Sequence, residues 1–248
     1  MPAQTSPRSL PQQWEIQIRA HQQAGGLFRY SAVLARRSGG GSVMTGAPDV
    51  ECAADTLLHQ VRTCTLCAPH LPLGPRPVLQ LASSARLLIA GQAPGRKVHA
   101  SGVPFDDASG ERLRQWLGIS RETFYDPTQV AILPMGFCYP GTGRSGDLPP
   151  RPECAPKWRN SLLALLPRVP LTLVIGQYAQ AYQWPDSKLN LTGLVAQWRQ
   201  FWPDVVPLPH PSPRNNLWLK RNPWFELELL PALRQRVAEV LSQAQLQG

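Results

Sequence analysis

Four short apolar runs alternate along the chain with longer stretches of helical periodicity, and this alternation limits the folds open to it. The runs lie at residues 86–90, 130–133, 171–175 and 205–208, and their length is typical of buried strands. Strands that alternate with helices form a parallel sheet covered by helices on both faces. We therefore predict an α/β fold, a three-layer α/β/α sandwich around a central four-stranded parallel sheet.

The expected helices lie before, between and after these runs. They cover residues 49–64, 111–117, 158–166, 177–184, 191–202 and 224–246. Ser109 is expected to cap the second of them, since serine is a favoured N-cap residue. Ligands of such sheets bind at the carboxyl ends of the strands. We therefore expect the loops that begin at Gly91, Pro134 and His210 to meet at one site.

Composition divides the chain of 248 residues into an N-terminal extension, 1–48, and one globular domain, 49–248. The extension contains Ser-Gly-Gly-Gly-Ser at residues 38–42, which is typical of a flexible linker. Its five Arg and one Glu supply four of the nine net positive charges of the chain. Either the extension is a basic arm for nucleic acid, or translation begins naturally at Met44.

The net charge of +9 favours an anionic partner, with nucleic acid preferred over an acidic membrane. No apolar run approaches the roughly 20 residues that a membrane span needs, and we recognise no signal peptide. We therefore expect a cytoplasmic protein that does not enter membranes. The basic residues Arg96, Lys97, Arg144, Arg151 and Arg214 are expected around the mouth of the site.

Two loops at the expected carboxyl edge of the sheet carry residues suited to ligand binding. Residues 91–95 read Gly-Gln-Ala-Pro-Gly, and glycines allow a close backbone approach while amides at such a turn can bind an anion. Residues 209–216 read Pro-His-Pro-Ser-Pro-Arg-Asn-Asn. His210 between two prolines suits a hydrogen-bonding or electrophilic role, or else it is satisfied by backbone groups in a surface turn.

Four of the five cysteines form two pairs. Cys64 and Cys67 have the spacing Cys-x-x-Cys, whereas fifteen residues separate Cys138 from Cys154. Four thiolates delivered in this way can surround one tetrahedral metal ion or one iron–sulfur cluster. The spacing alone leaves zinc, a [4Fe-4S] cluster and unliganded cysteines open.

The two loops together resemble the uracil-DNA glycosylase superfamily, in which a Gly-x-x-Pro-Gly loop and a His-Pro-Ser loop form the base pocket. The resemblance covers about residues 57–240. It includes Gly-Val-Pro-Phe at 102–105 and Ser-Gly at 109–110, which are similar to segments of the iron–sulfur, family 4-like bacterial branches. Residues 210–215 are similar to the second motif of the single-strand-selective monofunctional branch.

The resemblance implies a monofunctional DNA glycosylase of base excision repair, a hydrolase that acts on uracil or a related damaged base flipped out of DNA. It also implies a monomer in the bacterial cytosol. The alternatives are a catalytically weak or inactive module of the same fold that binds damaged or single-stranded DNA, and a small-molecule or nucleotide-binding α/β protein with a redox cluster. The iron–sulfur branches have their cysteines in the same order, which implies a [4Fe-4S] cluster on Cys64, Cys67, Cys138 and Cys154. The alternatives are zinc or no metal.

The resemblance also assigns roles to single residues. His210 would donate a hydrogen bond to the departing base as charge develops on it, with Gln92 as the second catalytic residue and Phe105 stacked on the base. The other base-binding residues would be Gly91, Ala93, Pro94 and Gly95. The DNA-binding residues would be Arg144, Ser212, Arg214, Asn215 and Asn216. The wedge that enters the DNA would be Leu217, Trp218 or Arg214.

Two positions depart from the iron–sulfur pattern. Gln92 stands where those branches have Glu, so the first motif offers no carboxylate to activate water, and Pro134 stands where an Asn would read uracil. Gln92, His99 or Asp106 could activate water instead. Alternatively, the substrate is another deaminated or oxidised base, or the protein binds DNA without cleaving it.

Overall fold

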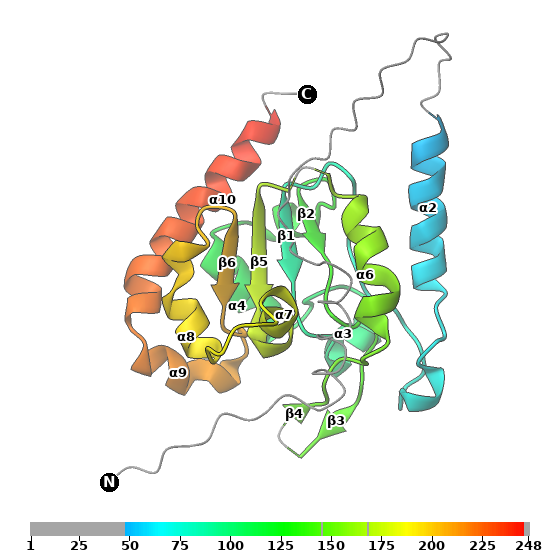
Figure 1. Cartoon of the computed structure of the whole chain (residues 1–248), viewed down its shortest axis with the longest axis horizontal. Coiled ribbons are helices and arrows are strands. Elements are labelled where there is room, and N and C mark those ends of the chain that lie inside the picture. The colour runs from blue at the N-terminus through cyan, green and yellow to red at the C-terminus, as the bar shows by residue number, and fades with distance from the viewer. Residues whose placement is uncertain (1–47, 145, 168, 246–248) are drawn as a thin grey trace.

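The computed structural model describes residues 48–144, 146–167 and 169–245, so the N-terminal extension lies outside the described residues except for Pro48. The predicted three-layer α/β/α sandwich is confirmed (Figure 1). Its sheet has four parallel strands in the order β2-β1-β5-β6. Their bounds are β1 Leu87–Ala90, β2 Val130–Ile132, β5 Leu171–Ile175 and β6 Val205–Leu208.

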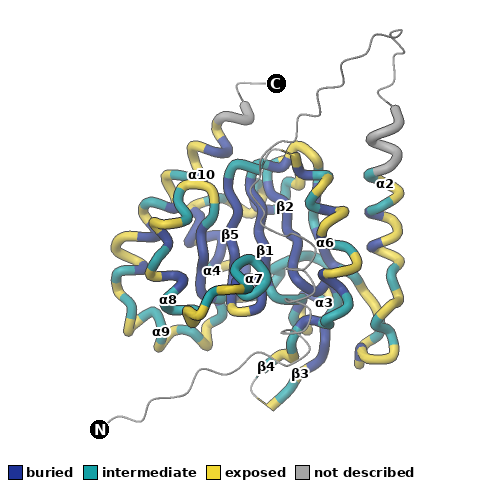
Figure 2. Tube along the Cα trace, in the orientation of Figure 1, coloured by how far each residue is buried: buried dark blue, intermediate teal, exposed yellow. Residues whose placement is uncertain are grey.

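Strand β1 lies in the middle of the sheet, where Leu88 is aligned with Ala131 of β2 and Thr172 of β5. All four strands are almost wholly buried (Figure 2). Such burial on both faces explains why each strand appears in the sequence as a continuous apolar run.

Alternate residues of β1 point to opposite layers of the sandwich. Leu87 and Ile89 pack in the core cluster that includes the helices α4, α5 and α10, whereas Leu88 packs in the cluster formed with α2 and α6. In Figure 1, α7 lies in front of the sheet and α4 behind it. The bounds of these helices are α2 Pro48–Arg62, α4 Ala108–Leu117, α5 Arg121–Tyr125, α6 Cys154–Ala164, α7 Gly176–Gln183 and α10 Leu230–Gln245.

The remaining elements are short. They are the helices α3 Arg96–Ser101, α8 Leu191–Ala196 and α9 Asn216–Arg221, the 3-10 turns η1 Ala68–His70, η2 Trp198–Gln200 and η3 Pro213–Asn215, the π-helix η4 Phe225–Leu229, and the hairpin strands β3 Thr142–Gly143 and β4 Gly146–Asp147. Sequence periodicity does not predict α3, α5, α9 or the hairpin, because a stretch of two to six residues shows no repeat. No helix in the described part of the chain is long and apolar enough to cross a membrane.

Three predictions about helices need correction. Asp107, not Ser109, caps α4, since its Oδ1 accepts a hydrogen bond of 2.9 Å from the N–H of Gly110 while Ser109 is buried within the helix. The helix expected over 191–202 ends at Ala196, and a 3-10 turn follows. The last helix starts as a π-helix before it continues as α10.

Candidate functional site

The carboxyl ends of the strands open into a pocket at the lower edge of the sheet in Figure 1, near α3 and the β3–β4 hairpin. The three loops predicted to meet there do so, because Gly91 after β1, Pro134 after β2 and His210 after β6 all line this pocket. Backbone hydrogen bonds tie the first two loops together. The N–H of Met135 donates to the oxygen of Gly91 at 2.9 Å.

The structure brings most of the predicted site residues to the pocket. Its lining includes Gly91, Gln92, Ala93, Pro94, Gly95, Phe105, His210, Ser212, Arg214 and Asn215. Two predicted DNA-binding residues lie elsewhere: Arg144 is exposed in the turn of the hairpin, and Asn216 is exposed where α9 begins. Arg151, which was also expected near the mouth of the site, lines the cysteine cavity described below.

His210 is held by the turn that follows β6. Its Nδ1 accepts a hydrogen bond of 3.2 Å from the N–H of Ser212, and its carbonyl oxygen accepts one of 2.7 Å from Nδ2 of Asn215. Burial lowers the pKa of the imidazole, and the nearby charge of Asp107 opposes this effect only in part. A neutral ring whose Nδ1 accepts must carry its proton on Nε2, so His210 retains one N–H donor.

Phe105 adopts a backbone conformation that is unusual for a side chain of its size, with φ at +54°. Its ring packs edge-on against Phe124, with centroids 6.1 Å apart, and lies against the backbone of Gly91. Gly110 makes this arrangement possible. A Cβ on Gly110 would lie only 1.8 Å from the carbonyl oxygen of Phe105.

Two carboxylates that the motifs did not indicate, Asp107 and Asp147, also line the pocket. Asp107 caps α4, and Asp147 lies on the β3–β4 hairpin, within a segment rich in Gly, Ser and Pro. The preference of Asp for N-caps would have located Asp107, whereas no local signal marks Asp147. Asp106, an earlier candidate, is paired with Arg121 at 3.2 Å and is not among the described lining residues.

The other candidate for activating water, His99, lies in α3 and is also absent from the described lining of the pocket. Burial lowers the pKa of its ring, and the charge of Arg76 lowers it further. Its ring lies 6.0 Å from that of Tyr139, between centroids. His99 therefore packs near Tyr139 and is not among the described residues that line the pocket.

The three wedge candidates differ in their surroundings. The Nε1–H of Trp218 donates to Oγ1 of Thr192 at 2.8 Å, and its ring packs edge-on against Phe225. Arg214 lines the pocket. Leu217 projects into solvent and is 57% exposed.

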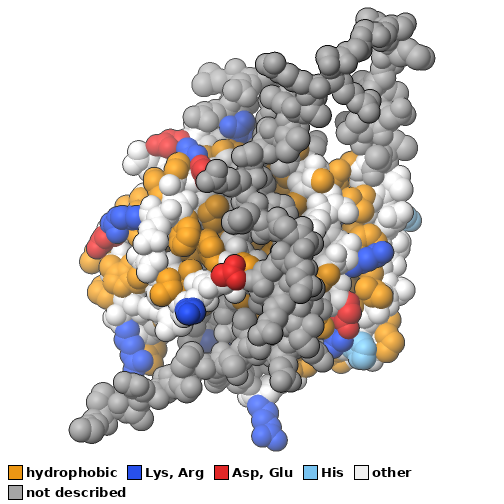
Figure 3. All heavy atoms as spheres, viewed as in Figure 1, with side chains coloured by type: hydrophobic (Ala, Val, Ile, Leu, Met, Phe, Trp, Pro, Cys, Tyr) orange, Lys and Arg blue, Asp and Glu red, His pale blue; other side chains and the backbone are white. Residues whose placement is uncertain are grey.

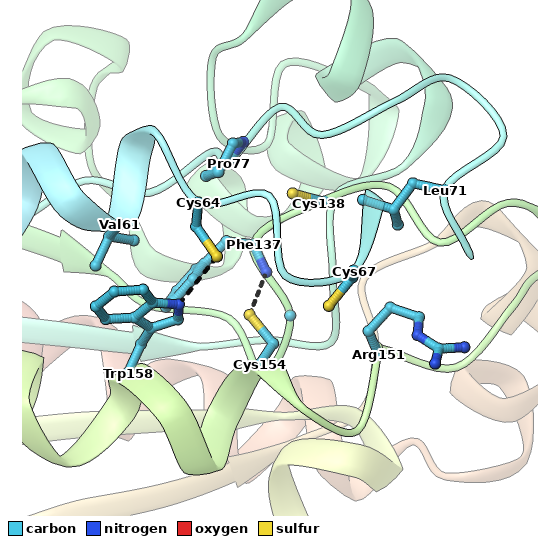
Figure 4. Close-up of a pocket in the computed structure, with 11 residues that line it drawn as sticks. Val61, Cys64, Cys67, Leu71, Pro77, Phe137, Cys138, Arg151, Cys154 and Trp158 are labelled. Carbon is cyan, nitrogen blue, oxygen red and sulfur yellow. Dashed lines mark hydrogen bonds between the residues drawn. The ribbon is translucent and has the colours of Figure 1, made fainter. Parts of the chain in front are cut away.

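The four predicted cysteine ligands lie around one small cavity of about 20 Å³ (Figure 4). Cys64 and Cys67 come from the segment after α2, Cys138 from the loop after β2, and Cys154 from the start of α6. Two N–H groups point at sulfur. Nε1 of Trp158 lies 3.3 Å from Sγ of Cys64, and the backbone nitrogen of Phe137 lies 3.4 Å from Sγ of Cys154.

Burial disfavours thiolates in this cavity. It is the main reason why the pKa of Cys138 is raised to about 11 and that of Cys154 to about 12, and these values include a smaller raising effect of the neighbouring cysteines and an opposing effect of backbone hydrogen bonds. A cationic group would reverse this effect, because metal-bound thiols are deprotonated. Among the described residues, no three His, Cys, Asp or Glu side chains are arranged to hold a single metal ion.

A comparison with protein families identifies the superfamily to which the chain is similar. The family described as "Uracil DNA glycosylase superfamily" matches residues 80–234. The match spans all four strands of the central sheet and every loop of the pocket, and it includes Cys138 and Cys154. It begins after Cys64 and Cys67.

Proposed function

This chain belongs to the uracil DNA glycosylase superfamily, and we propose from this premise that it hydrolyses the N-glycosidic bond of uracil or a related damaged base in DNA. The members of this superfamily are glycosylases that act on DNA. A base inside a duplex is inaccessible, so the enzyme must receive it flipped out of the stack. The pocket at the carboxyl edge of the sheet would hold the flipped base.

The observation that carries this proposal is the hydrogen bond from the N–H of Ser212 to Nδ1 of His210, which assigns the proton of the neutral ring to Nε2. When the glycosidic bond breaks, its electron pair leaves with the base, and negative charge grows on the base oxygens. A neutral histidine with its proton on Nε2 can donate a hydrogen bond to such an oxygen without passing a proton to it. Donors preorganised where charge develops typically contribute several kcal/mol to lowering the barrier.

Two further features of the pocket suit a flipped base. The ring of Phe105 offers a flat apolar surface, on which a base can stack with a gain of roughly 1–3 kcal/mol. Pro134 lines the same pocket and offers no side-chain donor or acceptor. We therefore propose that hydrogen bonds at the position of Pro134 contribute less to base selection in this chain than they do in uracil-reading relatives, which have Asn there.

We propose that the DNA backbone crosses the carboxyl edge of the sheet. Arg96 and Lys97 are exposed at the start of α3, Arg214 lies at the pocket, and Lys220 and Arg221 end the short helix α9. Figure 3 shows that Lys and Arg side chains occur around the visible face, its lower edge included. Neutralised phosphates would make DNA binding weaken steeply as salt rises.

We propose that Cys64, Cys67, Cys138 and Cys154 hold a [4Fe-4S] cluster. The chemistry of the donors supports this proposal, because four cysteine sulfurs line the same small cavity and two of them face N–H groups. Hydrogen bonds to ligand sulfurs are common around these clusters. The group would cross-link three segments that are far apart in sequence, so its contribution would be structural.

The test is a panel of oligonucleotides that carry uracil, hypoxanthine, xanthine or oxidised bases, in single and double strands. We expect release of at least one base and strand breakage on alkali treatment. DNA binding that weakens with salt and survives removal of residues 1–43, without any base release, would select the alternative of a non-cleaving DNA-binding module. Absence of both binding and release would defeat the proposal.

A further inference from the structure

The β3–β4 hairpin brings the carboxylate of Asp147 close to the loop at residues 91–95, which includes Gln92. Nε2 of Gln92 donates a long hydrogen bond of 3.4 Å to the carbonyl oxygen of Leu148, and Asp147 is the preceding residue. Oδ2 of Asp147 lies 3.3 Å from the position that a Cβ on Gly95 would take. The carboxylate therefore lies against Gly95 of the 91–95 loop, and Gln92 of the same loop contacts the residue that follows Asp147.

The hairpin fixes the position of Asp147. Thr142 is aligned with Asp147 in the two-stranded sheet, and the hydroxyl groups of Thr142 and Tyr139 are hydrogen-bonded to each other. Gly146 has φ at +131°, a conformation that favours glycine. A side chain on Gly146 would also collide with the guanidinium of Arg214, so the hairpin packs directly against the loop that follows His210.

The neighbouring carboxylates are committed to other partners. Oδ1 of Asp107 accepts the hydrogen bond that caps α4, and Asp106 is paired with Arg121. Asp147 is exposed at the mouth of the pocket, where a water molecule can reach it. We propose that Asp147 is the catalytic base that takes a proton from the attacking water, a role that rests on the proposed glycosylase function.

The step balances without any further reactant. The bond between the base nitrogen and C1′ of the sugar breaks, and its electron pair leaves with the base, whose oxygen His210 stabilises. The water oxygen forms a bond to C1′ and gives its proton to the carboxylate of Asp147. The products are the free base, which later takes up a proton from solvent, and an abasic sugar with a hydroxyl group on C1′.

The charges around Asp147 determine the pH at which it can act. Although Asp147 is exposed, neighbouring atoms partly desolvate its carboxylate and raise its pKa; the positive charge of Arg214 lowers this pKa and the negative charge of Asp107 raises it, with a net shift upward. His210 faces the same pocket but is neutral, and Arg144 is exposed on the turn of the hairpin itself. Asp147 must be ionised to accept the proton. Because its pKa is raised, acidification should begin to lower the excision rate at a higher pH than it would for an Asp with the ordinary pKa.

The experiment is single-turnover excision from the best substrate of the panel, across acidic to neutral pH. We expect Asp147→Asn to slow excision by roughly 100-fold and to abolish the acidic fall in rate, while DNA affinity and melting temperature stay unchanged. Asp204→Asn is the matched control, since Asp204 is exposed just before β6, at the opposite edge of the sheet. Formate should restore part of the rate of Asp147→Ala, which a purely structural role would not allow.

Excision by Asp147→Asn at the wild-type rate, with the acidic fall retained, would overturn this assignment and leave the glycosylase function standing. Failure of formate to restore any activity to Asp147→Ala would also count against a catalytic base. Failure of the wild-type protein to release any base would overturn both proposals together.

Discussion

The backbone N–H of Ser212 donates a hydrogen bond of 3.2 Å to Nδ1 of His210. This contact joins two residues of one tight turn, and it decides the chemistry of the ring because it assigns the remaining proton to Nε2. The alternative interpretation, that backbone groups satisfy His210 in a surface turn, therefore holds for only one of its two ring nitrogens. The backbone satisfies one ring nitrogen and leaves the other as the donor.

Replacing His210 should cost most of the catalytic rate. We expect His210→Ala to slow excision by at least about 100-fold, the typical effect of removing one donor that stabilises developing charge. The measurement is the single-turnover rate at saturating enzyme, so that weaker binding does not contribute. His59→Ala serves as the control, since His59 is exposed on α2. Equal rates for the wild type and His210→Ala would show that the histidine plays no catalytic part.

His210 should also make stability depend on pH. Burial lowers its pKa in the folded protein, while the unfolded chain has the ordinary value of about 6.5. Below that value the unfolded chain binds more protons, so stability present above pH 6.5 is lost as the pH falls toward the folded pKa. We expect the free energy of unfolding of the wild type to drop more on acidification than that of His210→Gln. Parallel curves for the two proteins would contradict this.

The fold could be predicted from the sequence because its strands are buried on both faces. Each strand is then a continuous apolar run, and the four predicted runs match β1, β2, β5 and β6 to within one residue at each end. Short elements escaped prediction because their conformation depends on contacts with distant segments. The segment over residues 140–151 is an example, since its turn residues suggest a flexible loop although it forms the β3–β4 hairpin.

The candidate site was predictable where it follows the strand ends. Gln92, Phe105 and His210 line the predicted pocket, since parallel strands deliver their following loops to one edge. Asp147 was not predictable, because nothing in its local sequence indicates that it lies next to Gly95. That proximity exists only once the hairpin has formed against the loop that follows β6.

Gly110 should be intolerant of any side chain. Its Cβ would lie 1.8 Å from the carbonyl oxygen of Phe105, and the backbone there cannot yield without moving the stacking ring. We expect Gly110→Ala to lower the free energy of unfolding by about 3 kcal/mol, at the upper end of overpacking effects. Chemical denaturation measures this directly.

The control for this variant is Gly193→Ala. Gly193 lies in α8, and its nearest side-chain atoms would be 3.4 Å from an added Cβ, which is ordinary contact. Alanine is favoured over glycine in helices by up to about 1 kcal/mol, so this variant should be as stable as the wild type or more stable. Equal losses in the two variants would refute the steric argument.

The cysteine cavity predicts a coloured protein. Anaerobically purified wild type should be brown, absorb broadly across the visible range and contain iron and sulfide in equal amounts. Cys154→Ser should lose the iron and unfold at a lower temperature, because the cross-link between α6 and the segment after α2 is gone. Cys52→Ser, which alters the cysteine outside the set of four, should keep its iron. Colourless wild-type protein with stoichiometric zinc would show that the four cysteines bind zinc, the alternative metal, and not a cluster.

Leu217 should matter only when the target base is paired. A side chain that fills the space left by a flipped base stabilises the open duplex, whereas a single strand has no such gap to fill. We therefore expect Leu217→Ala to slow excision from duplex DNA by about tenfold, the equivalent of 1.4 kcal/mol, and to leave single-strand excision unchanged. Leu227→Ala is the matched control, since Leu227 is 76% exposed in η4. Equal slowing on both substrates would mean that Leu217 supports the pocket rather than the flipped state.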